Sequence, residues 1–134
     1  MLADGSCHCG NIRYEAEVDP ARVAICHCTD CQVLTGSPYR VSVVVPADRF
    51  RLLAGEPKIY MKTAQSGNRR AHGFCPDCGT PVFARPDADP PPTYTLRIGS
   101  LAQRAQLPPQ RQIWCRSMLD WSQDVRGLPS SPGQ

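Results

Sequence analysis

Apolar and polar residues alternate along this chain in short runs that are separated by turn-forming residues. Residues 11–18 (NIRYEAEV) carry an apolar side chain at every even position, and a period of two is typical of a strand with one buried face. Residues 39–45 (YRVSVVV) are rich in the β-branched residues that strands favour. Further runs of strand length lie at residues 57–63, 80–85, 93–99 and 111–114. The pattern predicts a mainly β fold of short antiparallel strands with at most one or two short helical turns.

One segment, residues 29–36 (TDCQVLTG), favours a helix. Thr29 and Asp30 are residue types that cap helix N-termini, and Gly36 is the type that commonly ends a helix. The segment has room for only a turn or two. We therefore expect one short helix that begins at Thr29 or Asp30 and stops at Gly36.

The chain has the length of a single domain. Its 134 residues include 10 Gly and 14 Pro, scattered between the apolar runs, and this composition suits a turn-rich β fold. Residues 85–93 (RPDADPPPT) are a predicted loop, because proline donates no hydrogen bond to a sheet. The chain shows no internal repeat and no linker. We expect one domain over residues 1–125 and a flexible C-terminal tail over residues 126–134.

Seven of the eight cysteines fall into three short groups, and Cys115 stands apart. The N-terminus lacks the apolar core of a signal peptide, and no run approaches the ~18 apolar residues of a membrane span. We therefore expect a cytoplasmic protein without a membrane segment. In a reducing cytosol, clustered cysteines indicate metal binding more than disulfides. The groups are Cys7 with Cys9, Cys26 with Cys28 and Cys31, and Cys75 with Cys78.

The two pairs together supply four thiolates, the number that a closed tetrahedral zinc site needs. Alternate residues of an extended chain point to one face, so the first pair would present both sulfurs on one side of a strand. The second pair reaches the same arrangement through a tight turn, for which the intervening Pro and the following Gly are suited. Zinc binding can supply ~10 to 16 kcal/mol, enough to offset closure of the long loop between the pairs. The spacing predicts a structural zinc ion at Cys7, Cys9, Cys75 and Cys78.

The triplet of Cys26, Cys28 and Cys31 supplies one ligand fewer. Catalytic zinc sites hold three protein ligands and leave the fourth position to water or substrate. Three thiolates make zinc a poor activator of water and favour a soft thiol as the fourth ligand. The triplet therefore predicts a second, open zinc site for thiol chemistry, giving two zinc ions per chain. The alternative is closure by a further protein ligand, for which the candidates are Cys115, His72 and His27.

The formal net charge of +3 invites a nucleic-acid-binding interpretation. Zinc-bound cysteines are deprotonated, and seven thiolates with two zinc ions bring the formal charge to zero. No basic run or long tail is present, so we expect no nucleic-acid partner. Four arginines can form a local positive patch or remain solvated surface residues: Arg13, Arg40, Arg69 and Arg70.

Several segments resemble a known family in order and spacing. They are GSCHCGNIRYE, CHCTDCQVLTGSP, FCPDCGTPVF, RIGSL, and the IW that precedes Trp121. Together they resemble the glutathione-dependent formaldehyde-activating enzyme family, also called the CENP-V/GFA domain, from about Gly5 to Trp121. The cysteine pattern is the specific part of this resemblance.

The resemblance implies an Mss4-like, mainly β fold with two zinc ions. Cys7, Cys9, Cys75 and Cys78 match the structural site of the family, and Cys26, Cys28 and Cys31 match its catalytic triplet. The implied activity is carbon-sulfur lyase chemistry that joins glutathione and formaldehyde as S-hydroxymethylglutathione, with the glutathione thiol at the open zinc position. The alternative is a non-catalytic zinc scaffold that binds a protein partner. The TGSPY segment after the triplet either lines the pocket or forms an ordinary turn.

Overall fold

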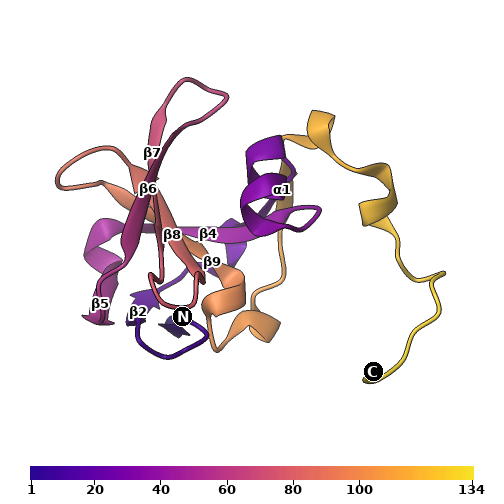
Figure 1. Cartoon of the computed structure of the whole chain (residues 1–134), viewed down its shortest axis with the longest axis horizontal. Coiled ribbons are helices and arrows are strands. Elements are labelled where there is room, and N and C mark those ends of the chain that lie inside the picture. Colours follow the sequence, from indigo (N-terminus) through magenta and orange to yellow (C-terminus); the bar gives the residue numbers. More distant parts are fainter.

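The computed structural model describes residues 1–134, which form two sheets and a single α-helix (Figure 1). The smaller sheet has the order β1 (Leu2–Ser6), β2 (Arg13–Glu17) and β5 (Phe50–Ala54). The larger sheet has the order β10 (Arg111–Ile113), β3 (Val23–Cys26), β4 (Arg40–Pro46), β9 (Thr93–Arg97), β8 (Pro81–Pro86), β7 (Arg69–Phe74) and β6 (Lys58–Thr63). All strand pairs are antiparallel except β10 with β3. The expected mainly β fold is confirmed.

Six of the ten strands were predicted from the sequence pattern, and four were not. The predicted ones are β2, β4, β6, β8, β9 and β10. Strand β1 escaped prediction because its buried positions, Ala3 and Gly5, are too small to give a hydrophobic signal. Strands β5 and β7 have no regular apolar alternation, and β3 is only four residues long. The missing strands include two that position cysteines, since β3 ends at Cys26 and β7 precedes Cys75.

The helix α1 (Thr29–Thr35) lies where the sequence predicts one, but its N-terminal cap is a different residue. Cys28 has an extended backbone at the N-cap, and its sulfur accepts a hydrogen bond from the Cys31 N–H at 3.3 Å. The prediction of Thr29 or Asp30 as the cap is therefore wrong, because a sulfur already fills that role. Gly36 ends the helix in the left-handed conformation, with φ of 61°, as predicted.

Single 3-10 turns are more numerous than the one or two short helical turns expected. They are η1 (Pro20–Arg22), η2 (Ala47–Arg49), η3 (Ile98–Ser100), η4 (Arg104–Gln106), η5 (Cys115–Ser117) and η6 (Asp120–Gln123). No helix in the structure has the length and apolarity that a membrane span requires. Residues after η6 form no helix or strand and are exposed, and Figure 1 shows this segment running apart from the sheets. Its flexibility stays a prediction.

The core lies between the two sheets, and aromatic rings join them. Phe50 of the smaller sheet stacks on Tyr94 of the larger one, with ring centroids 4.4 Å apart. Phe83 meets both rings edge-on, at 5.8 Å from Phe50 and 5.0 Å from Tyr94. Tyr14 extends the cluster at 5.5 Å from Phe50. These large apolar contacts fix how the sheets face each other.

Tyr14 also connects the core to the end of strand β9. Its hydroxyl donates to Ser100 Oγ at 2.7 Å, because the Ser100 hydroxyl donates onward to the Arg97 carbonyl at 2.8 Å. Burial raises the pKa of Tyr14 to about 12. The ring has room because Gly5, its partner in the β1–β2 register, has no side chain.

We expect Gly5→Ala to destabilise the protein by about 2 kcal/mol or more, since overpacking of this size typically costs 1–3 kcal/mol. The added Cβ would overlap the Tyr14 ring. Gly99→Ala is the matched control, because nothing lies within 4 Å of a Cβ there. Urea unfolding followed by circular dichroism measures both variants. An unchanged midpoint for Gly5→Ala would contradict this packing.

Candidate metal centres and the adjoining pocket

The four cysteines of the two pairs lie together, with all their sulfurs within 4.8 Å of one another. Cys7 and Cys9 occupy the turn between β1 and β2, and Cys75 and Cys78 occupy the turn between β7 and β8. Cys7 Sγ lies 3.6 Å from Cys9 Sγ, which lies 3.8 Å from Cys75 Sγ. A tetrahedron with zinc-sulfur bonds of about 2.3 Å has edges of about 3.8 Å. The spacing therefore fits four thiolates around one zinc ion.

Local backbone geometry aims these sulfurs inward. Cys7 and Cys9 lie in a turn and not on a strand, so the predicted strand geometry for this pair is wrong. The Cys7 sulfur accepts the Ile12 N–H at 3.2 Å, which fixes the turn around it. Gly79 adopts the left-handed conformation that the sequence predicts, with φ of 76°. A hydrogen bond with Thr80 lowers the pKa of Cys78 to about 5.

The triplet forms a second group of sulfurs, also within 4.8 Å of one another. Cys26 is the last residue of β3, Cys28 is the N-cap of α1, and Cys31 lies in the first helical turn. A strand end, a cap and a helix thus contribute one thiol each. Hydrogen bonding with Cys26, aided by neighbouring Arg40, lowers the pKa of Cys31 to about 5, so this thiol ionises first. Three soft sulfur donors at this separation fit a zinc ion with three protein ligands.

None of the proposed closing residues joins the triplet. Cys115 is exposed in η5 and belongs to neither sulfur group. His27 is fully buried, and its Nε2 pairs with Gln112 Oε1 at 2.7 Å. His72 Nδ1 accepts from an Arg97 guanidinium N–H at 3.2 Å. The triplet therefore gains no fourth donor from these residues in this structure.

A pocket of about 340 Å³ opens onto the triplet. Six basic side chains from six different elements line it. Asp30 supplies the one carboxylate of the pocket, and this carboxylate pairs with Lys62 at 3.0 Å. Trp114 lies at its edge in a left-handed conformation with φ of 57°, and the Arg116 guanidinium lies 4.7 Å from its ring centroid. The basic residues are Arg22, Arg40, Lys62, Arg70, Arg97 and Arg111. Such a pocket attracts small anions.

Comparison with known proteins identifies the family to which this chain belongs. The family model described as glutathione-dependent formaldehyde-activating enzyme matches residues 2–117, most of the chain. The chain belongs to this family. The family that the cysteine-containing segments indicated in the sequence is thereby confirmed.

Two individual matches agree with the family assignment. A Penicillium rubens protein named "Putative glutathione-dependent formaldehyde-activating enzyme" is 31% identical over 87 residues, which are 63% of this chain and 44% of that protein. The match thus spans less than half of that relative. A crystal structure of a Rhodobacter sphaeroides protein superposes with a TM-score of 0.62 at 20% identity, over 84% of this chain and 99% of that one. This second likeness shows the fold.

The sequence indicated only part of the pocket. Of the four arginines considered as a patch, Arg40 and Arg70 line it, whereas Arg69 pairs with Asp87 at 2.9 Å and Arg13 lies elsewhere. Arg97 was missed, although it stands directly before η3 in the RIGSL segment. The only available signal was an arginine within an otherwise buried strand end.

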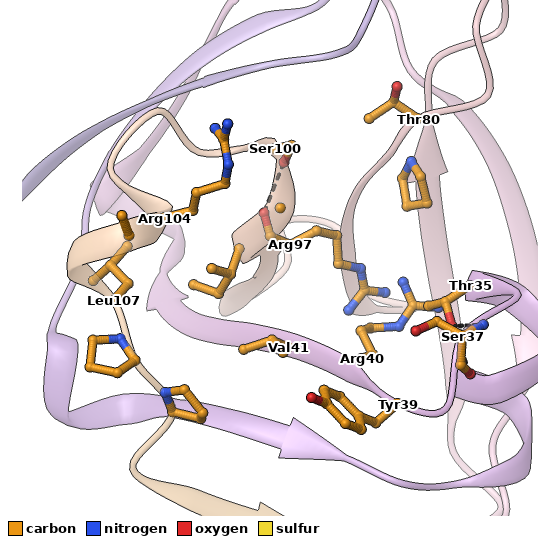
Figure 2. Close-up of a pocket in the computed structure, with 16 residues that line it drawn as sticks. Thr35, Ser37, Tyr39, Arg40, Val41, Thr80, Arg97, Ser100, Arg104 and Leu107 are labelled. Atoms are coloured by element: carbon orange, nitrogen blue, oxygen red, sulfur yellow. Dashed lines mark hydrogen bonds between the residues drawn. The ribbon is translucent and has the colours of Figure 1, made fainter. Parts of the chain in front are cut away.

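The TGSPY segment does not line the triplet pocket. Thr35, Ser37 and Tyr39 line a neighbouring pocket of about 640 Å³ (Figure 2). Arg40 and Arg97 line both pockets and so form a shared wall between them. Figure 2 shows their guanidinium groups next to each other in that wall.

We expect the purified protein to hold two zinc ions per chain, measured by inductively coupled plasma mass spectrometry. Cys115→Ser should keep both ions, because Cys115 lies outside both groups. Cys28→Ser should keep one, and Cys75→Ser should lose cooperative thermal unfolding, since structural zinc supplies folding free energy. One zinc ion in the wild type, or a cooperatively folded Cys75→Ser, would contradict the two-site assignment.

Proposed function

We propose that this protein is a zinc-dependent carbon-sulfur lyase-type enzyme acting on glutathione adducts of small aldehydes. The reaction is the formation or cleavage of S-hydroxymethylglutathione. The observation that carries the proposal is a three-thiol group that lines a basic pocket, in a chain of the glutathione-dependent formaldehyde-activating family. Neither a closed metal site nor a neutral pocket would suit an anionic thiol substrate.

The two sulfur groups are proposed to have different tasks. Cys7, Cys9, Cys75 and Cys78 would hold a structural zinc ion that joins two turns, and Cys26, Cys28 and Cys31 would hold the second zinc ion. A zinc ion on three thiolates would accept a thiol as fourth ligand and keep it deprotonated. The donor set supports this choice of metal, since thiolates select zinc over magnesium or calcium.

The reaction needs a nucleophilic sulfur and a nearby aldehyde. The glutathione sulfur loses its proton and adds to the carbonyl carbon of formaldehyde, the carbon-oxygen double bond becomes single, and the oxygen takes up a proton. The reverse reaction breaks the same carbon-sulfur bond. The chain contributes positioning, because holding both reactants in one small pocket replaces a bimolecular encounter.

The basic side chains support glutathione as the thiol. Glutathione carries two carboxylates and one ammonium group, so it reaches the pocket as an anion. Arg22, Arg70 and Arg111 come from three different elements, take part in no ion pair and line the pocket. Their combined field raises the local concentration of such a ligand. A cytoplasmic location is proposed as well, supported by eight cysteines that are all free of disulfides.

We expect isothermal titration to show that reduced glutathione binds the zinc-loaded wild type and binds Cys28→Ser at least about tenfold more weakly, because one thiolate of the open site is lost. Cys115→Ser is the matched control, as it replaces a cysteine outside the pocket. Circular dichroism verifies that each variant is folded. If Cys28→Ser binds glutathione as tightly as the wild type does, the thiol site is wrong, and a non-catalytic scaffold becomes the better interpretation.

A further inference from the structure

Four buried side-chain nitrogens in the whole chain have no hydrogen-bond partner, and three of them belong to residues of the triplet pocket. These three are Arg40 Nε, His72 Nε2 and Arg97 Nε. Buried polar atoms are almost always paired in folded proteins. Such a concentration of unpaired atoms on one wall indicates a ligand that would pair them.

The two arginines are buried charges without a carboxylate partner. Arg40 is 5% exposed and Arg97 is 7% exposed, and neither takes part in any of the five ion pairs of the protein. Arg97 donates to Ser42 Oγ at 3.1 Å and to His72 Nδ1 at 3.2 Å, both neutral acceptors. Burial, aided by Arg40, lowers the pKa of Arg97 to about 9. A buried charge without a counter-ion is strongly unfavourable.

The triplet alone does not balance these charges. Three thiolates around one zinc ion carry a formal charge of −1, whereas Arg40 and Arg97 together carry +2. Lys62 is already neutralised by Asp30, and Arg70 donates to the neutral Thr95 Oγ. Before a substrate binds, this wall therefore keeps one positive charge in excess, which an anionic ligand would balance.

His72 shows what kind of group is missing. Burial, reinforced by Arg97 and the other nearby cations, lowers the pKa of His72 to about 3, so the ring is neutral. Because Nδ1 accepts from Arg97, the proton lies on Nε2. All three unpaired atoms are then N–H donors. They match an anionic group that only accepts hydrogen bonds, and a carboxylate is such a group.

We propose that Arg40 and Arg97, with His72 beside them, form a subsite for a carboxylate of the thiol substrate. The subsite holds that carboxylate while the sulfur reaches the triplet. A carboxylate fits better than the oxygen of the aldehyde, because both guanidinium charges need a partner before any reaction begins. The thiol part of this inference rests on the proposed function, but the binding of a carboxylate does not.

The first test compares an arginine of the pocket with one outside it. Arg97→Gln should weaken glutathione binding by about 10- to 100-fold, the range typical for losing a hydrogen bond to a charged group. Arg13→Gln removes the same charge from an exposed position on β2, outside the pocket, and should weaken it less than about threefold. Equal losses in the two variants, or no loss for Arg97→Gln, would overturn the subsite.

The second test identifies the carboxylate. Glutathione glycine ethyl ester lacks one free carboxylate, and cysteinylglycine lacks the other together with its residue. One of the two should bind the wild type about tenfold or more weakly than glutathione, and that difference should vanish in Arg97→Gln. If both differences persist unchanged in Arg97→Gln, Arg97 does not hold either carboxylate.

The third test works without a thiol. Sodium acetate should raise the melting temperature of the wild type and of Arg13→Gln more than sodium chloride does at equal ionic strength, and it should not do so for Arg97→Gln. Without ligand, Arg97→Gln should be as stable as the wild type or more so, since a buried charge is removed. If Arg97→Gln does not fold, Arg97→Lys replaces it. We then expect acetate to raise the melting temperature less than in the wild type, because lysine lacks the paired guanidinium donors that bind both oxygens of a carboxylate. No acetate effect on the wild type overturns the subsite; an acetate effect without glutathione binding refutes only the proposed function.

Discussion

The connection between two distant turns at the four-sulfur group is the constraint on which the rest of the structure depends. Cys9 and Cys75 are 66 residues apart in sequence, yet their sulfurs lie 3.8 Å apart. Bringing such distant segments together is costly in chain entropy, and the small core between a three-stranded and a seven-stranded sheet must share that cost. A metal ion at this junction would fix the β1–β2 turn against the β7–β8 turn. Phe50 of the smaller sheet would then be held against Phe83 and Tyr94 of the larger sheet.

The pocket depends on this arrangement because its residues come from many elements. The triplet is local, within six residues of one strand end and one helix start, but the basic residues around it lie on β4, β6, β7, β9 and β10 and in η1. The backbone carbonyl of Arg97 accepts a hydrogen bond from the Ser100 hydroxyl, which in turn accepts one from Tyr14 of the smaller sheet. A residue of the triplet pocket is thus positioned by the core of the protein, and packing and charge cannot be varied independently there.

The sequence predicted what depends on local spacing. Cysteines two or three residues apart identify both sulfur groups, and alternating apolar residues identify strands such as β2 and β4. It did not reveal β1, where the glycine facing Tyr14 gives no apolar signal, nor the cap of α1, where a sulfur replaced the usual oxygen. Arg97 could not be assigned to a pocket because β9 comes near β3 only through its pairing with β4. Lys62 could not be assigned because β6 is the far edge strand of the same sheet and meets the helix through the Lys62–Asp30 pair at 3.0 Å. Pairing between distant strands leaves no local trace in the chain.

The double position of Cys28 links metal chemistry to the folding of α1. The same sulfur belongs to the triplet and accepts the Cys31 N–H that would otherwise be unpaired at the helix start. A helix of seven residues has little stability of its own. Oxidation or alkylation of this thiol would therefore alter a candidate metal donor and a helix cap in one event, so that the shape of the pocket and its capacity to hold a metal ion depend on the same atom.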